Sequence, residues 1–162
     1  MPVLVTGATG FVGAHIVLEL LSRNKPVRAM VRDESLISMF PESDLLEIVK
    51  GDLFDVDSLK HAVDGCDDVI HCAASLYVSA KDLQKEVIDP SVEGVRNLCS
   101  VMDGVKRVVH TSSVAAIRPT KYHNGQVFSD EDWCNDATPV SNAYGLAKAE
   151  AEKIMRNWAN ER

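Results

Sequence analysis

The stretch VLVTGATGFVG at residues 3–13 decides the fold. A short run rich in β-branched residues leads into a turn in which glycine recurs at every third position, at Gly7, Gly10 and Gly13. In such a turn the first glycine permits a tight bend, the second lets a ligand approach the backbone, and the third lets a helix pack close to a strand. The stretch therefore predicts a strand, a glycine turn and the start of a helix.

A second strand completes a βαβ unit around this turn. Apolar side chains at helical spacing run from Val12 to Leu21, and polar side chains fall on the other side of the predicted helix. Asn24-Lys25-Pro26 ends that helix before a second apolar strand at residues 27–31. Because parallel strands need a crossover of this kind, the unit predicts a parallel sheet.

Strands and helices continue to alternate along the chain. The remaining predicted elements, strand and helix by turns, lie at residues 45–49, 57–63, 68–72, 83–102, 107–111 and 142–158. Pro90 interrupts the fourth of them, and a loop rich in Pro, Asn, Asp and Gly precedes the last. The pattern predicts the α/β class, with a Rossmann-type doubly wound parallel sheet of five strands in the order 3-2-1-4-5 and helices on both faces, in three α/β/α layers.

Length and composition predict a single domain over residues 1–162, since 162 residues with 46% hydrophobic content suit one core. The net charge of −7 argues against nucleic-acid or membrane partners, and no apolar run approaches the roughly 20 residues that span a bilayer. We therefore expect a cytoplasmic protein. The four cysteines are too widely spaced to grip zinc and are expected to be reduced thiols, with Cys72 and Cys99 in the core and Cys134 more exposed.

The fifth predicted strand, at residues 107–111, should form an open edge of the sheet. The doubly wound fold usually has six strands, and this chain predicts five. An apolar strand at an open edge favours pairing with another chain. We therefore expect a homodimer or strand exchange through this edge.

Residues that follow the second and third strands predict how a dinucleotide would be held. Proteins that prefer NAD place an acid after the second strand to bind the ribose 2′-hydroxyl, whereas this chain has Arg32 there. A cation suits a 2′-phosphate, so the sequence favours NADP (NADPH) over NAD. The next residue, Asp33, could still accept a hydrogen bond from the ribose hydroxyl, as in proteins that bind NAD. Asp52, after the third strand, could reach the adenine amino group or be a turn aspartate.

Three residues in the last third of the chain form a candidate proton-transfer site. The fifth strand leads to Ser113, and the last helix carries Tyr144 and Lys148, which share a face because they are four residues apart. The lysine ammonium would favour the tyrosinate, so that the phenol could give its proton to a forming alkoxide. Ser113 would donate a hydrogen bond to the same oxygen.

Other candidate functional residues have weaker support in the sequence. Tyr77 and Lys81 have the same four-residue spacing, but Tyr77 lies just after the fourth strand and is expected to line a pocket wall. His71 and His110 end or follow apolar strands and are expected to be core or crevice histidines. No spacing of acids, histidines and cysteines predicts a metal site.

Taken in order, these motifs resemble those of the extended short-chain dehydrogenases/reductases, and most of all the branch of dihydroflavonol reductases and NADPH-dependent aldehyde/ketone reductases. The motifs that carry the resemblance are TGATGFVG at 6–13, VRAMVRD at 27–33, GDL at 51–53, HCAA at 71–74, TSS at 111–113, DEDW at 130–133 and NAYGLAK at 142–148. The resemblance covers nearly the whole chain.

The resemblance implies roles for individual residues. In that family the matching serine, tyrosine and lysine form a catalytic triad, which implies catalytic roles for Ser113, Tyr144 and Lys148. It implies cofactor contacts for Gly7, Thr9, Gly10, Phe11, Val12, Gly13, Arg32, Asp52, Leu53, Ala73, Ala74, Tyr144 and Lys148. Family members continue into a C-terminal substrate domain, which we expect to be absent from these residues.

The leading hypothesis is an NADPH-dependent oxidoreductase that reduces the carbonyl of a small aldehyde or ketone, present as its cofactor-binding portion with low or absent turnover. A second hypothesis is an NAD-dependent nucleotide-sugar epimerase or dehydratase, which uses the same fold and triad. A third is a non-catalytic NAD(P)-binding or interaction module. Preference for NADPH or NADH separates the first two, and turnover separates both from the third.

Overall fold

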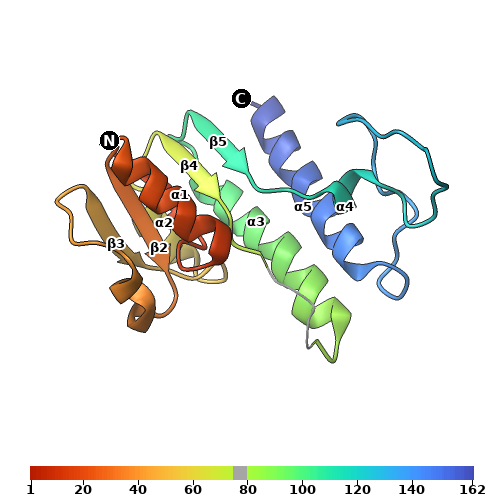
Figure 1. Ribbon diagram of the computed structural model, residues 1–162, viewed down its shortest axis with the longest axis horizontal. Coiled ribbons are helices and arrows are strands. Elements are labelled where there is room, and N and C mark those ends of the chain that lie inside the picture. Colours follow the sequence, from red (N-terminus) through yellow and green to blue (C-terminus); the bar gives the residue numbers. More distant parts are fainter. Residues whose placement is uncertain (75–79) are drawn as a thin grey trace. The chain divides into compact units, whose positions relative to one another are not determined.

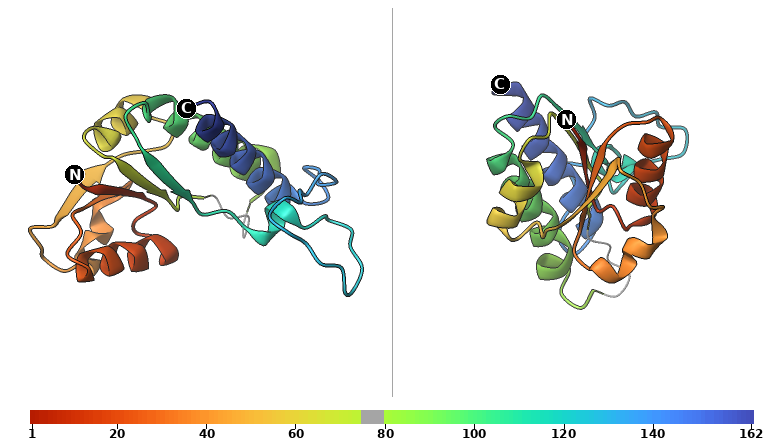
Figure 2. Two further views of the ribbon diagram at one scale, coloured as in Figure 1. Left: turned by 90° about the horizontal axis from the view of Figure 1, so that it is seen from above. Right: turned by 90° about the vertical axis from the view of Figure 1, so that its left-hand side faces the viewer.

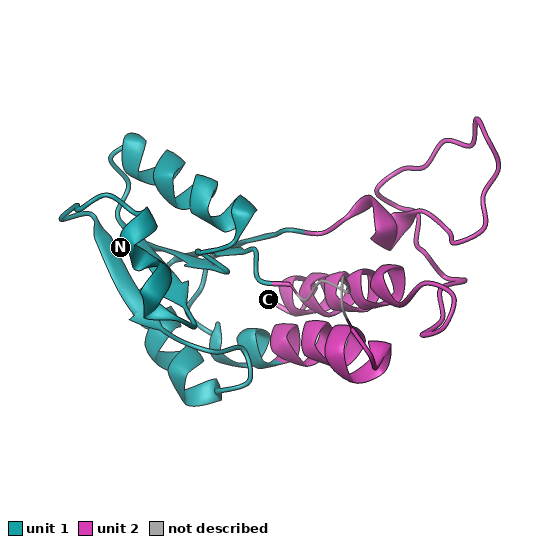
Figure 3. Cartoon of the chain, turned by 60° about the horizontal axis from the view of Figure 1, so that its bottom comes forward, with its two compact units in different colours: residues 1–73, 97–111 teal, residues 74–96, 112–162 magenta. Residues whose placement is uncertain are grey.

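A computed structural model describes residues 1–74 and 80–162 (Figure 1). They form two compact units, one of residues 1–73 and 97–111 and the other of residues 74–96 and 112–162 (Figure 3). Tyr77, expected to line a pocket wall, lies outside the described residues. The first unit contains the sheet and the glycine turn, and the second contains the last helix with the loop before it.

The first unit is built on a five-stranded parallel sheet in the order β3-β2-β1-β4-β5, as predicted. Its strands are β1 (Val3–Thr6), β2 (Val27–Val31), β3 (Leu46–Lys50), β4 (Asp68–His71) and β5 (Arg107–His110). The central strands are the most deeply buried, with Leu4 and Val5 of β1 fully inaccessible. Near-continuous apolar strands of this kind suit a parallel sheet covered on both faces.

Helices cover both faces of this sheet. They are α1 (Phe11–Ser22), the 3₁₀ helix η1 (Glu34–Met39), α2 (Val56–Val63) and the C-terminal end of α3 (Asp89–Val101). Helix α1 and η1 lie on one face, and α2 with the end of α3 lies on the other (Figures 1 and 2). The predicted α/β/α layering is therefore confirmed. Val17 of α1 and Leu59 of α2 are both fully buried.

The second unit is mainly helical. It contains the π-helical turn η2 (Gln84–Ile88), the start of α3, the short helix α4 (Val114–Ile117) and the long helix α5 (Ala143–Asn160). Ala143 and Ala147, one turn apart on α5, pack against the buried side chains of Val87 and Ile88 in η2. Small side chains at this spacing let the two helical segments approach closely.

Most predicted element boundaries are displaced by one or two residues, and the predicted helix at 83–102 is divided. The chain forms the π-helical turn first, and α3 begins at Asp89, so that Pro90 lies in the first turn of α3. Proline has no N–H to donate to the preceding turn, and the π-helical turn, with its wider hydrogen-bonding spacing, lies directly before α3. Helices η1 and α4 were not predicted, because they are too short to show a hydrophobic period.

The expectation that Cys134 is exposed is wrong. Its side chain is 2% exposed, whereas Cys72 and Cys99 are half-buried. The Cys134 N–H donates to the Ala116 carbonyl oxygen at 2.8 Å, which draws the loop beneath α4. The hydrogen bond to Ala116, which is distant in sequence, could not be predicted from the residues around Cys134. All four cysteines are free thiols.

Strand β5 is the outer strand of the sheet on the side of β4. Its Val109 side chain is 59% exposed. The predicted apolar edge strand is therefore confirmed, and pairing with another chain stays a prediction.

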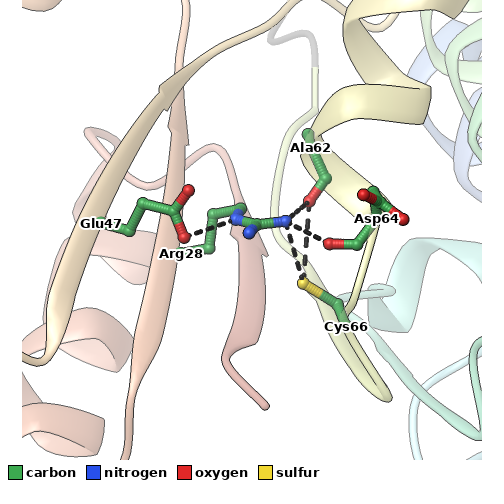
Figure 4. Close-up of polar contacts among 5 residues, drawn as sticks. All are labelled: Arg28, Glu47, Ala62, Asp64 and Cys66. Carbon is green, nitrogen blue, oxygen red and sulfur yellow. Dashed lines mark hydrogen bonds and ion pairs between the residues drawn. The ribbon is translucent and has the colours of Figure 1, made fainter.

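Arg28 joins three parts of the first unit at the amino ends of the strands (Figure 4). Its Nε donates to Glu47 Oε2 on β3 at 2.8 Å, and its Nη1 donates to the carbonyl oxygens of Ala62 and Asp64 at the end of α2. The same nitrogen lies 3.6 Å from the sulfur of Cys66, a thiol whose pKa burial raises. One side chain of β2 thus supplies partners for two carbonyls that end a helix.

Replacing Arg28 should therefore cost stability. Arg28→Met keeps much of the apolar stem but leaves two helix-terminal carbonyls without this donor, so we expect the free energy of unfolding in urea to fall by about 1–3 kcal/mol. Arg23→Met is the matched control, because Arg23 pairs with Glu19 at the surface, with side chains 69% and 57% exposed. It should change that free energy by no more than about 0.5 kcal/mol. Equal losses in both variants would contradict a structural role for Arg28.

Candidate nucleotide-binding turn and proton-transfer residues

The turn after β1 requires glycine at its first position. Gly7 has a φ of 65°, in the left-handed region, and a Cβ there would lie 2.7 Å from the backbone nitrogen of Ala73. Both features exclude a side chain. The predicted tight bend is confirmed, and it brings the end of β1 against the residue that follows β4.

The third glycine makes a still closer contact. A Cβ on Gly13 would lie 2.2 Å from the carbonyl oxygen of Gly7, so α1 can start beside β1 only without that side chain. Close packing of helix and strand, the predicted role of this glycine, is confirmed. A Cβ on Gly10 would meet a single atom of the described residues within 4 Å, the Gly7 carbonyl oxygen at 3.2 Å, and Gly10 is exposed. Packing alone therefore does not explain the middle glycine.

The N-terminus of α1 suits an anion. Its N-cap residue, Gly10, offers no side-chain acceptor, and the first turn contains no acidic residue. The first N–H groups of a helix have no intrahelical acceptor, and the helix dipole adds partial positive charge there. This fits the phosphates of a dinucleotide, because glycine leaves the backbone accessible to them.

Phe11 and Val12 were predicted to contact the cofactor, and these contacts stay a prediction. The Phe11 side chain is 85% exposed, and both side chains line a groove of about 580 Å³ together with His15 and Ile70. Phe11 and Val12 lie in the first turn of α1, where their backbone N–H groups have no acceptor within the helix. A contact with phosphate would therefore involve the backbone.

A buried hydrogen bond holds the turn at the ends of β1 and β4. Thr6 Oγ1 and His71 Nδ1 lie 2.7 Å apart, and the Ala73 N–H donates to the same hydroxyl oxygen at 3.4 Å. The His71 ring, 2% exposed, stacks on that of His110 with centroids 5.4 Å apart. The expectation of a core histidine is confirmed for His71. Its bond to Thr6 fixes the segment against which Gly7 packs.

Arg32 and Asp33, which follow β2, differ in what they bind. Arg32 is exposed and forms no ion pair within residues 1–74 and 80–162. Asp33 accepts the Ser35 N–H at 2.9 Å, and this hydrogen bond at the start of η1 lowers the pKa of its carboxyl. The cation thus remains available to a ligand, while the acid caps a helix.

Asp52 and Leu53, which follow β3, take part in a turn. The Asp52 carboxylate accepts the Phe54 N–H at 2.9 Å, so the turn role left open by the sequence is observed. The Leu53 carbonyl oxygen accepts from the side chain of Asn97 at 2.9 Å. Both residues are half-buried. The turn is therefore fixed by bonds from both sides, and an adenine contact stays a prediction.

The three predicted catalytic residues all lie in the second unit. Ser113 is the N-cap of α4, where its hydroxyl oxygen accepts the Ala115 N–H at 3.1 Å, and α4 packs against α5. On α5 the Lys148 ammonium nitrogen lies 6.0 Å from the centre of the Tyr144 ring. Lys148 is 7% exposed and Tyr144 is half-buried. The shared face predicted for tyrosine and lysine is confirmed.

Asn142 holds the start of α5, and sequence reasoning missed this role. Its Oδ1 accepts the Gly145 N–H at 2.9 Å, and its Nδ2 donates to Thr120 Oγ1 at 3.1 Å. A Cβ on Gly145 would lie 2.4 Å from that Nδ2, so the cap and the glycine depend on each other. An asparagine before a helical run was the available signal. The turn that carries Tyr144 is therefore fixed to the loop after α4.

Within residues 1–74 and 80–162, no group of three histidine, cysteine or acidic side chains is placed to hold a metal ion. Over the same residues, each helix is too short or too polar to cross a membrane.

The glycine turn and the candidate triad fall within one family match. The NAD dependent epimerase/dehydratase family matches residues 3–162. The chain belongs to this family. The resemblance inferred from the motifs is thereby confirmed.

Individual members of the epimerase/dehydratase family extend the comparison. Dihydroflavonol 4-reductase of Hordeum vulgare is 36% identical over 174 residues, which cover 99% of this chain and 49% of the relative. The crystal structure of yeast methylglyoxal/isovaleraldehyde reductase Gre2, complexed with NADPH, has a TM-score of 0.88 at 29% identity and covers 99% of this chain and 53% of its own. A short-chain dehydrogenase/reductase superfamily protein of Agrobacterium tumefaciens with bound NAD has a TM-score of 0.75 at 27% identity, covering 97% and 44%. The chain spans about half the length of the curated relatives it matches.

Proposed function

We propose that the chain is the nucleotide-binding portion of an NADPH-dependent oxidoreductase that reduces the carbonyl group of a small aldehyde or ketone. The observation that carries the proposal is the pairing of a buried Lys148 ammonium with the Tyr144 ring on α5, 6.0 Å apart, in a chain whose first turn suits a dinucleotide. Family membership supports the same chemistry.

The residues of the turn fit the dinucleotide. The exposed backbone at Gly10 and the first N–H groups of α1 would receive its phosphates, and Arg32 would pair with a 2′-phosphate. We assign further contacts to Gly7, Thr9, Phe11, Val12, Gly13, Asp52, Leu53, Ala73 and Ala74. When bound, NADPH would supply the hydride that adds to the carbonyl carbon.

The triad would complete the reduction by supplying a proton. The Tyr144 hydroxyl would donate its proton to the carbonyl oxygen as negative charge develops there, so that the product is an alcohol. The Lys148 ammonium would stabilise the tyrosinate left behind and bind the nicotinamide ribose. The Ser113 hydroxyl would donate a hydrogen bond to the same oxygen, and it can do so while its own oxygen still accepts the Ala115 N–H, because a hydroxyl both donates and accepts.

Arg32 supports the preference for NADP within the proposal. Similar solved structures hold NADPH in one case and NAD in another, so the likeness of folds leaves both cofactors open. The exposed guanidinium of Arg32 has no carboxylate partner within residues 1–74 and 80–162, whereas the neighbouring Asp33 already accepts the Ser35 N–H. A cation available at this position favours a phosphate over a hydroxyl.

Calorimetric titration with each cofactor tests this assignment. We expect NADPH to bind at least about tenfold more tightly than NADH, since a charge-assisted bond contributes about 1.5–3 kcal/mol. Arg32→Ser should remove most of that difference, and Arg23→Ser, at the exposed residue that follows α1, should leave it unchanged. Equal or tighter binding of NADH would overturn the NADP preference and favour the epimerase hypothesis. Binding no tighter than millimolar for both cofactors would overturn the dinucleotide site.

Replacement of the Tyr144 hydroxyl tests the proton donor. In the whole polypeptide that carries residues 1–162, Tyr144→Phe should lower kcat for aldehyde reduction by about 10²–10⁴-fold, because a positioned proton donor contributes about that much. Its affinity for NADPH should stay within about threefold, a difference below 1 kcal/mol.

The matched control is Tyr122→Phe, which removes a hydroxyl that accepts from Arg118 at 2.9 Å and should leave kcat unchanged. Retention of most activity in Tyr144→Phe would rule Tyr144 out. Stoichiometric NADPH binding by the whole polypeptide, without turnover on a panel of aldehydes and ketones, would support the non-catalytic module instead.

The edge strand supports one further part of the proposal, a homodimer or strand exchange. Val109 of β5 is 59% exposed at the outer side of the sheet, and open apolar edges pair with other strands. A monodisperse monomer at high concentration in light scattering would overturn it.

A further inference from the structure

Glu152 is a buried acid that the proposed reaction does not use. It is 9% exposed, and Lys148 is the other charged side chain buried within the described part of the chain. Tyr144, Lys148 and Glu152 follow one another at intervals of four residues on α5, so they lie along one side of the helix. An acid in this position requires partners, because burial of an unpaired carboxylate is strongly unfavourable.

The carboxylate has a partner on each oxygen. The hydroxyl of Ser112 donates to Glu152 Oε2, and Nε of Arg156, one turn later on α5, donates to Oε1 at 2.8 Å. Arg156 is fixed in turn, since its guanidinium lies 5.2 Å from the centre of the Trp133 ring and donates to the Asp130 carbonyl oxygen at 3.2 Å. The acid is therefore held in one orientation.

Ser112 connects this acid to the proposed catalytic serine. Ser113 follows it directly, with extended backbone and its hydroxyl at the N-cap of α4. Because neighbouring side chains share one peptide unit, anchoring Ser112 limits where the Ser113 hydroxyl can point. The anchor comes from the helix that carries Tyr144 and Lys148, although Ser112 and Glu152 are 40 residues apart in sequence.

We propose that Glu152 is a positioning residue for the proton-transfer site. Its carboxylate, oriented by Arg156, binds the Ser112 hydroxyl and thereby sets the place of Ser113 relative to Tyr144 and Lys148. The proposal rests on the proposed function of those three residues. A role in packing alone would not require an acid here, because apolar residues of similar volume replace buried ion pairs without loss of stability in other proteins.

Kinetics separate positioning from stability. Glu152→Ala should lower kcat per folded molecule by about 10–100-fold, since misplacement by about 1 Å can cost 10²-fold, while the affinity for NADPH changes by less than about twofold. Glu152→Gln should lose less, because an amide oxygen can still accept the Ser112 hydroxyl. Ser112→Ala should reproduce the loss in kcat, and combining it with Glu152→Ala should add little, as expected for two residues that act through one contact.

Glu150→Ala is the matched control on the same helix. Glu150 pairs with Lys153 at 3.0 Å and is partly exposed, so its loss should leave kcat unchanged. If Glu152→Ala does not fold, Glu152→Gln takes its place in the test, because glutamine keeps the size of the side chain. Unchanged kcat in folded Glu152→Ala, or a loss of equal size in Glu150→Ala, would overturn the proposal.

Amide exchange gives a readout that needs no turnover. The Ala115 N–H donates to Ser113 Oγ, so its hydrogen exchange, followed by NMR under native conditions, reports how firmly that hydroxyl is held. We expect exchange at Ala115 to be at least about tenfold faster in Glu152→Ala and unchanged in Glu150→Ala, because losing a hydrogen bond of about 1.4 kcal/mol corresponds to that factor. Unchanged exchange in Glu152→Ala would overturn the positioning role. Absence of carbonyl reduction in the whole polypeptide that carries residues 1–162 would overturn the proposed function, and the exchange result would still stand.

Discussion

The contact between Gly13 and the carbonyl oxygen of Gly7 is the constraint on which the first unit depends. A side chain at Gly13 would come within 2.2 Å of that oxygen, so helix α1 can begin directly beside β1 only because Gly13 has none. The same turn presses Gly7 against Ala73 after β4, and the buried Thr6–His71 bond holds that approach. The outcome is a helix N-terminus that presents backbone N–H groups at the carboxyl end of the sheet, where ligands of such folds bind.

Helix α5 has the corresponding role in the second unit. Side chains at intervals of four residues give it a tyrosine, a buried ammonium and a buried carboxylate on one side. Asn142 fixes its first turn to the loop after α4, and Glu152 fixes its middle to Ser112. The residues with proposed chemistry are thus held by neighbours that do no chemistry themselves. Placement of a few groups by a rigid support is what proton transfer requires.

The sequence predicted what local periodicity and glycine chemistry determine. The five strands, their order and the βαβ turn follow from short apolar runs, helical spacing and the requirement for a crossover between parallel strands. It did not predict α4, which has four residues and no hydrophobic period, or the burial of Cys134, which depends on a bond to Ala116. The four-residue spacing of Glu152 from Lys148 was visible, but its partner Ser112 is distant in sequence and is brought near only by the fold.

The central claim is that the N-terminus of α1 receives the phosphates of a dinucleotide. The most direct measurement is the change in amide chemical shifts of ¹⁵N-labelled protein as NADPH is added. The account predicts that the largest changes fall on the backbone N–H groups of residues 10–13, because those groups would donate to the phosphates. Saturable changes confined to other surfaces, with residues 7–13 unaffected, would contradict it.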